Sequence, residues 1–256
     1  MKRTSIAGLL AVVLVLMASG CSDDDQNVPS SLQATKPQPR LLYVAVGASE
    51  TFGLGAADPL RESWPQVFYR KALPRRASFV NLGIPGATVA DALTKEALYT
   101  ARLKPELVTV WLNVNDILSG AGAEAYERDL NELLRLVTTD DETTVLVANT
   151  PPLEWLPSYR SCLPNPPAGA PDCEFEGTWP RPKVVDRLIA TYNLAIDRVA
   201  ARVGASVVDL HSATLALVRR GRGADLVSGD GFHPSTEGHR EVARAFTEAF
   251  AGVPQG

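Results

Sequence analysis

The sequence predicts a three-layer α/β/α domain in which helices cover both faces of a five-stranded parallel sheet. Short apolar runs alternate along the chain with longer stretches of helical character, and this alternation is typical of buried parallel strands with helices packed on each face. Hydrophobic residues make up 45% of the 256 residues, which is ample for one core. We therefore expect one folded domain, spanning residues 40–253.

The expected elements follow one another without internal repeats. Apolar runs predict strands at 41–46, 77–82, 106–112, 143–148 and 205–209. Helices are expected between and after them, at about 64–73, 88–99, 123–139, 184–203 and 236–251.

The first twenty residues have the layout of a secretory signal peptide. Lys2 and Arg3 precede an apolar run from Ile6 to Met17, and small residues follow it. This run is shorter than the roughly 18 residues that span a bilayer, which disfavours an uncleaved anchor. Residues 22–39 are rich in Ser, Asp, Gln and Pro and predict a flexible, solvated spacer.

Cys21 makes the leader more specific. The segment Ala18-Ser19-Gly20-Cys21 resembles a bacterial lipobox, although Ala18 stands where leucine is commoner. The resemblance implies cleavage after residue 20 and acylation of Cys21, so that residues 21–39 tether the domain to a membrane. We expect a lipid-anchored protein of the bacterial cell envelope that faces the periplasm or the exterior. A chance cysteine after an ordinary cleavage site is the alternative.

A Pro-rich insertion at about 151–182 interrupts the alternation of strands and helices. It contains Cys162 and Cys173, which an exported protein can keep oxidised as a disulfide. Metal binding is the other use of two cysteines, but no histidine lies in the segment and the spacing is not that of a zinc site. Long loops of this kind are usually functional or disordered. The insertion is expected either to form a wall or lid of a substrate pocket or to be a rigid surface excursion.

Three residues supply the types needed for nucleophilic catalysis. Ser49 lies in a small-residue turn after the first expected strand, and Asp230 and His233 lie three residues apart near the C-terminus. A serine hydroxyl becomes a nucleophile when a neutral imidazole accepts its proton, and a carboxylate fixes the tautomer of that imidazole. The other two histidines have blander interpretations: His211 follows a strand, and His239 is expected to be partly exposed in the first turns of a helix.

Two further segments can supply donors for an oxyanion. Gly83 offers an unobstructed backbone N–H and Asn115 offers a side-chain amide, each after an apolar run. Taken alone, Ser49 could be an ordinary turn residue and Asn115 a helix cap. Their joint placement after expected strands, where open α/β sheets hold ligands, favours one catalytic site.

The four segments, in this order, resemble the SGNH hydrolases, also called GDSL-type esterases and lipases. The resemblance runs from Gly47 to His233. It implies a flavodoxin-like α/β/α fold, Ser49 as nucleophile and first oxyanion donor, Gly83 and Asn115 as the other donors, and His233 as base with Asp230 as its partner.

The sequence departs from the family pattern at two positions. Ala48 replaces the usual Asp before the nucleophile, which removes no triad member. Asn113 replaces a glycine two residues before Asn115, which puts a side chain where the family keeps backbone room. An α/β-hydrolase is the rival fold, but that fold has a glycine two residues after the serine, where this chain has Thr51.

The implied activity is hydrolysis of carboxylic esters through an acyl-enzyme, without a metal or organic cofactor. Lipid, lysophospholipid and O-acetyl glycan esters are all compatible with it. An acyltransferase, a carbohydrate O-acetylesterase and a noncatalytic binding lipoprotein remain alternatives. The chain carries 25 Lys+Arg against 29 Asp+Glu, so it lacks the basic excess of a nucleic-acid binder. We expect a monomer.

Overall fold

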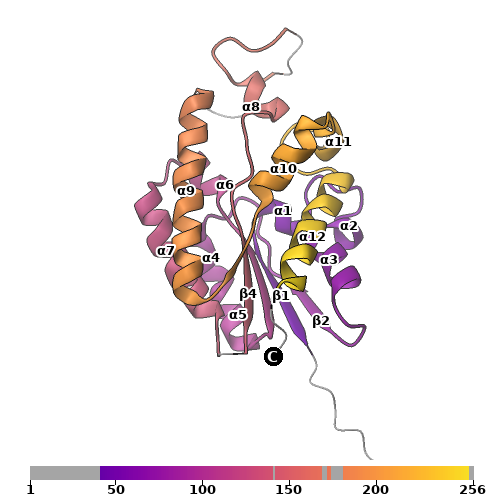
Figure 1. Cartoon of the computed structure of the whole chain (residues 1–256), viewed down its shortest axis with the longest axis vertical. Coiled ribbons are helices and arrows are strands. Elements are labelled where there is room, and N and C mark those ends of the chain that lie inside the picture. The colour runs from indigo at the N-terminus through magenta and orange to yellow at the C-terminus, as the bar shows by residue number, and fades with distance from the viewer. Residues whose placement is uncertain (1–40, 141, 169–171, 174–180, 254–256) are drawn as a thin grey trace, which may run out of the picture. The chain divides into compact units, whose positions relative to one another are not determined.

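A computed structural model describes residues 41–140, 142–168, 172–173 and 181–253 of the chain (Figure 1). The expected signal peptide and the tether from Cys21 lie outside the described residues. In the described part, no helix is both long enough and apolar enough to cross a membrane.

The centre of the domain is a five-stranded sheet whose neighbouring strands all run parallel. The strands are β1 (Leu42–Gly47), β2 (Ser78–Asn81), β3 (Leu107–Trp111), β4 (Thr144–Ala148) and β5 (Ser206–Val208), in the order β2-β1-β3-β4-β5. Central strands are covered on both faces, and every residue of β3 is buried. Their continuous apolar sequence follows from that burial. The predicted fold class is confirmed.

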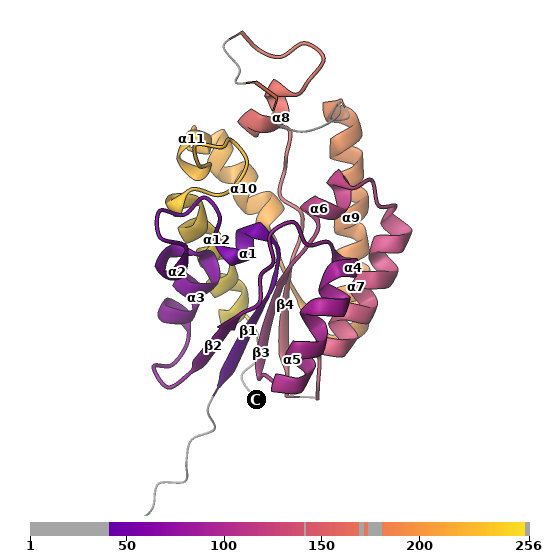
Figure 2. The ribbon, with the colours of Figure 1, turned by 180° about the vertical axis from the view of Figure 1, so that it is seen from behind.

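Helices cover the two faces of the sheet (Figures 1 and 2). One face packs against α4 (Val89–Lys95), α5 (Ala97–Leu103), α7 (Ala123–Val137) and α9 (Pro182–Val203), and the other against α3 (Trp64–Ala72) and α12 (Thr236–Ala251). Alternate residues of a strand point to opposite faces. Val44 of β1 therefore enters the first core, whereas Tyr43 enters the second.

The structure differs from the predicted helices in two ways. The stretch predicted as one helix at 88–99 is divided into α4 and α5 at Glu96. The sequence analysis also did not identify α10 (Leu210–Arg219) or the short helices, which are too brief to show a periodic pattern. These are α1 (Ser49–Phe52), α2 (Pro59–Glu62), α6 (Val114–Leu118), α8 (Pro157–Ser161) and α11 (Gly223–Leu226).

Part of the Pro-rich insertion is well packed. Residues Leu153, Leu156 and Tyr159 form a small apolar cluster with α9, next to the ends of the strands. A disulfide joins Cys162 to Cys173 with 4.8 Å between the Cα atoms. The insertion thus begins as a buried extension of the domain above β4 (Figure 1).

Candidate active site

Ser49 is the first residue of α1 and follows β1 after a single residue, Ala48. Its side chain is 5% exposed. The turn needs small residues: a Cβ at Gly47 would lie 2.1 Å from Thr51 Oγ1, and Gly53 ends the helix in the left-handed region at φ 112°. These constraints hold Ser49 at the carboxyl end of β1, the edge of the sheet where α/β folds bind ligands.

Asp230 and His233 are joined by a hydrogen bond of 2.7 Å between Asp230 Oδ2 and His233 Nδ1. The other carboxylate oxygen of Asp230 accepts hydrogen bonds from Ser228 Oγ and from the backbone N–H groups of Phe232 and His233. Burial alone would raise the pKa of Asp230, but these hydrogen bonds outweigh it and hold the pKa at about 2. The carboxylate is therefore charged and fixed at neutral pH.

Residues 227–235, which carry His233 and are called the histidine loop, pack closely against Gly55 in the segment that follows Ser49. A Cβ at Gly55 would lie 3.0 Å from His233 Cβ and 2.3 Å from the carbonyl oxygen of Pro234. The N–H of Ala57 also donates to Thr236 Oγ1 at 2.9 Å. The chain after α1 is thus attached to the segment that follows His233.

The Ser49 hydroxyl does not point at the base. It donates to Glu50 Oε2 at 3.3 Å, and no hydrogen bond joins Ser49 to His233 in the described part of the chain. Catalytic hydrogen bonds are often long or absent before substrate binds. The hydroxyl proton of Ser49 is therefore held by Glu50 and not by His233 in this structure.

Glu50 is a site residue that the sequence analysis missed. Its side chain is buried, with 8% of the residue exposed. Burial raises the pKa of its carboxyl group, against a smaller lowering effect of its own backbone N–H and of the nearby His233. No Lys or Arg forms an ion pair with it among the described residues. The only sequence signal was its position, directly after the nucleophile.

Of the three predicted oxyanion donors, Gly83 and Asn115 differ in their present hydrogen bonds. The Gly83 N–H donates to Asn81 Oδ1 at 2.9 Å, so a substrate oxygen must compete for it. Asn115 Nδ2 gives one proton to the Ala87 carbonyl oxygen at 3.0 Å and keeps a second one. Gly83 packs on α1, where a Cβ would lie 2.5 Å from the Phe52 nitrogen.

The side chain of Asn113, which replaces the family's glycine, is buried and contacts β4. Its Nδ2 donates to the carbonyl oxygen of Ala148 in β4 at 3.4 Å, and only 2% of the residue is exposed. Its Oδ1 is buried without a hydrogen-bond partner. The residue therefore bridges β3 to β4.

The remaining histidines are structural. His211 Nδ1 lies 3.0 Å from the Thr150 carbonyl oxygen. His239 was predicted to be partly exposed, and this is wrong: it is fully buried, with Nδ1 accepting from the Trp64 N–H and Nε2 facing the Leu54 carbonyl oxygen. Burial lowers its pKa to about 4. Helical position alone did not reveal that the loop after α1 covers it.

A model of the GDSL-like lipase/acylhydrolase family matches residues 45–241. This chain belongs to that family. The matched residues include the segments of all the predicted site residues from Ser49 to His233, and the family membership makes the chain an ester-hydrolysing enzyme. A search of curated proteins gives no match.

Solved structures share the fold of this acylhydrolase at low sequence identity. A lipase/acylhydrolase from Enterococcus faecalis is 19% identical with a TM-score of 0.58, over 84% of this chain and 99% of that one. The psychrotrophic esterase EstA from Pseudoalteromonas is 15% identical with a TM-score of 0.57, over 82% and 96%. An acetyl-xylooligosaccharide esterase from Geobacillus is 18% identical with a TM-score of 0.58, over 84% and 95%.

Two more buried carboxyl groups of this acylhydrolase accept hydrogen bonds from backbone N–H groups near the candidate site. Glu96 Oε2 accepts the Gly47 N–H at 2.8 Å, and burial raises the pKa of Glu96 to about 8. Asp116 accepts the Val89 N–H, and burial raises its pKa to about 6. Glu96 thus holds the end of β1, two residues before Ser49, and Asp116 holds the first residue of α4. Sequence patterns do not distinguish them from surface acids, because both lie in segments with other polar residues.

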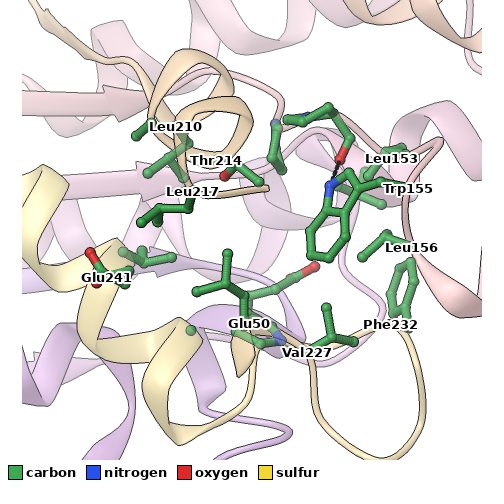
Figure 3. Close-up of a pocket in the computed structure, with 18 of the residues that line it drawn as sticks. Glu50, Leu153, Trp155, Leu156, Leu210, Thr214, Leu217, Val227, Phe232 and Glu241 are labelled. Atoms are coloured by element: carbon green, nitrogen blue, oxygen red, sulfur yellow. Dashed lines mark hydrogen bonds between the residues drawn. The ribbon is translucent and has the colours of Figure 1, made fainter. Parts of the chain in front are cut away.

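An apolar cavity of about 90 Å³ is lined by Glu50, the residue after the nucleophile, although neither Ser49 nor His233 lines it (Figure 3). Its walls come from the end of β3, the start of the Pro-rich insertion, α10, α12 and the histidine loop. Glu50 is the polar residue of the wall on the side of Ser49. The volume is several times what one water molecule needs, so the cavity can take part of a small organic group. Within the described ranges, no group of three or more His, Cys, Asp or Glu side chains could hold a metal ion.

Proposed function

We propose that this acylhydrolase is a serine esterase that works through Ser49, His233 and Asp230. The observation that carries the proposal is the 2.7 Å bond between Asp230 and His233 Nδ1, on a loop packed against the segment that follows Ser49. That bond leaves His233 Nε2 as the free ring nitrogen and holds the ring in the tautomer that can accept a proton there.

The proposed reaction has two acyl transfers. Ser49 Oγ attacks the ester carbonyl carbon while His233 Nε2 takes the hydroxyl proton, and the charge on imidazolium is balanced by Asp230. The backbone N–H groups of Ser49 and Gly83 and the side-chain amide of Asn115 stabilise the oxyanion. His233 then protonates the departing alcohol. Water, activated by the same nitrogen, cleaves the acyl-enzyme and restores Ser49.

The lining of the cavity supports an ester with an apolar portion over a large polar substrate. The cavity that Glu50 lines next to Ser49 consists mainly of aliphatic and aromatic side chains, including Leu153, Trp155 and Leu156 from the Pro-rich insertion. Buried polar groups of a ligand would find few partners there, which costs binding free energy. We therefore place lipid and other small apolar esters ahead of O-acetyl glycans as substrates, and assign the insertion to the pocket wall.

The test is hydrolysis of p-nitrophenyl esters from acetate to palmitate by the soluble form that begins at Ser22. Wild-type protein should turn over at least one chain length, and Ser49→Ala should reduce kcat by about 10⁴-fold or more. A fluorophosphonate probe should add its mass to the peptide that contains Ser49 in wild type only. Circular dichroism of both proteins controls for folding. Wild-type turnover that Ser49→Ala retains would refute the assigned nucleophile.

We also propose that the enzyme is lipid-anchored in the bacterial envelope through Cys21, after removal of residues 1–20. The support is the lipobox-like sequence that ends at Cys21 and the polar tether after it. Metabolic labelling with an alkyne analogue of palmitate should mark the full-length wild type. The variant Cys21→Ala should lose the label and leave the membrane fraction. Labelling that persists in Cys21→Ala would refute the assignment.

A further inference from the structure

Glu50 is a buried carboxyl group with which no Lys or Arg of the described residues forms an ion pair. The side chain lines the apolar cavity and also contacts Ser49, and Figure 3 shows its carboxyl group directed into the space that Trp155 and Phe232 also line. Buried charges in proteins are normally paired. The charged residues at the other end of the cavity do not serve Glu50, because Arg244 is paired with Glu241 and Glu248. An isolated carboxyl group in a cleft is a candidate for ligand recognition.

The walls around Glu50 are aromatic. Trp111 comes from the end of β3, Trp155 from the Pro-rich insertion and Phe232 from the loop that carries His233, and all three line the same cavity as Glu50. The Trp155 indole N–H already donates to the Pro152 carbonyl oxygen at 2.9 Å, so its ring face rather than its N–H is available to a ligand. Aromatic faces attract cations, and tryptophan does so most strongly.

One class of ligand fits a single carboxyl group within apolar and aromatic walls. A primary ammonium has three N–H donors that need acceptors, and a sugar has still more polar groups. A quaternary ammonium has no donor to satisfy, while its charge is complementary to Glu50 and its methyl groups are compatible with the aromatic rings. The charge of Glu50 and the small number of hydrogen-bond acceptors in the cavity therefore both favour a quaternary ammonium group.

We propose that this cavity binds a quaternary ammonium group on the alcohol part of the ester, with Glu50 and Trp155 as specificity-determining residues. The proposal rests on the proposed esterase function, since Glu50 Oε2 lies 3.3 Å from Ser49 Oγ. A choline-like alcohol carries its nitrogen only two carbons from the ester oxygen, so it can reach Glu50 while the carbonyl group meets Ser49.

The test compares two esters of equal shape and different charge: acetylcholine and 3,3-dimethylbutyl acetate, its neutral carbon analogue. Wild type should favour acetylcholine by about tenfold or more in kcat/KM, because a charge pair is added in a partly desolvated site. Glu50→Gln should bring this ratio close to one, and Trp155→Leu should lower it severalfold. The ratio is used because Glu50→Gln also changes a contact of Ser49.

The control is Glu237→Gln, which removes the same charge from a residue paired on the surface with Arg222 and Arg240 and should leave the ratio as in wild type. A wild-type ratio near one, with turnover that depends on Ser49, would overturn the cation site and leave the esterase intact. Absence of turnover on every ester would instead reject the proposed function. In that event, tetramethylammonium titrated against tryptophan fluorescence still tests the site: saturable quenching that Glu50→Gln abolishes supports it, and no quenching overturns it.

Discussion

The two sides of the active site differ in whether their hydrogen bonds are already those that catalysis requires. The histidine side is prepared in this sense, and the serine side is not. On the histidine side, Asp230 receives hydrogen bonds from three donors besides the imidazole of His233, and all lie within five residues of it. On the serine side, the Ser49 hydroxyl is held by Glu50 and the Gly83 N–H by Asn81. A local loop can arrange its own acid and base. The nucleophile and the oxyanion donors come from segments that follow different strands. A ligand must displace Glu50 from Ser49 and Asn81 from Gly83 before these groups can act on it.

The largest expected effect comes from breaking the prepared side. Asp230→Asn keeps the size of the side chain but removes the charge that balances imidazolium and the acceptor that fixes the tautomer. We expect kcat for a p-nitrophenyl ester to fall by about 10³–10⁴-fold, with little change in KM. Circular dichroism checks that the loop variant is folded. A fall of less than tenfold would mean that another group orients His233.

The next effect comes from the unprepared side. Asn115→Ala removes the amide that still has a free N–H for the oxyanion, and kcat should fall by about 10²–10³-fold. Asn113→Ala is the matched control, because the Asn113 side chain turns to β4 and its loss should affect stability more than kcat. Steady-state kinetics and thermal unfolding of both variants provide the comparison. Equal losses of kcat in the two variants would contradict the assigned donor.

A third prediction concerns Glu96, whose carboxyl group accepts the Gly47 N–H two residues before Ser49. The pKa of Glu96 is raised from 4.5 to about 8, so the folded state holds a proton that the unfolded state has lost between these values. Stability should therefore fall as pH rises through this window, by roughly 2 kcal/mol between about pH 6 and about pH 9. Glu96→Gln should remove this part of the slope. Urea unfolding at the two pH values measures it; an identical pH slope in both proteins would show that Glu96 is not the cause.

The smallest effect should come from a single support of the prepared side. Ser228→Ala removes one of the hydrogen bonds to Asp230 Oδ1 and leaves the two from backbone N–H groups. We expect kcat to fall about tenfold, which corresponds to about 1.4 kcal/mol. The pH dependence of kcat is the informative readout, since a merely structural change would not shift its acidic limb. A kcat equal to wild type would mean that the backbone donors suffice.

The sequence predicted much of the fold because the signals involved are local. Continuous apolar runs indicated all five strands within a few residues of their bounds, and the parallel sheet followed from their alternation with helices. The division of the predicted helix at Glu96 was missed, since an acid near a helix end looks like a surface residue. The burial of His239 was missed because the loop that covers it lies far away in sequence.

By itself, the sequence determined the order of the four motif segments and the Asp230–His233 pair, because three residues of chain are enough to bring these two side chains together. Only the tertiary structure decided the partners of Ser49, the orientation of Asn113 and the environment of Glu50. The physical reason is burial: β3, the Pro-rich insertion and the histidine loop converge on Glu50. They remove water from a carboxyl group that the sequence presents as one acid among 29.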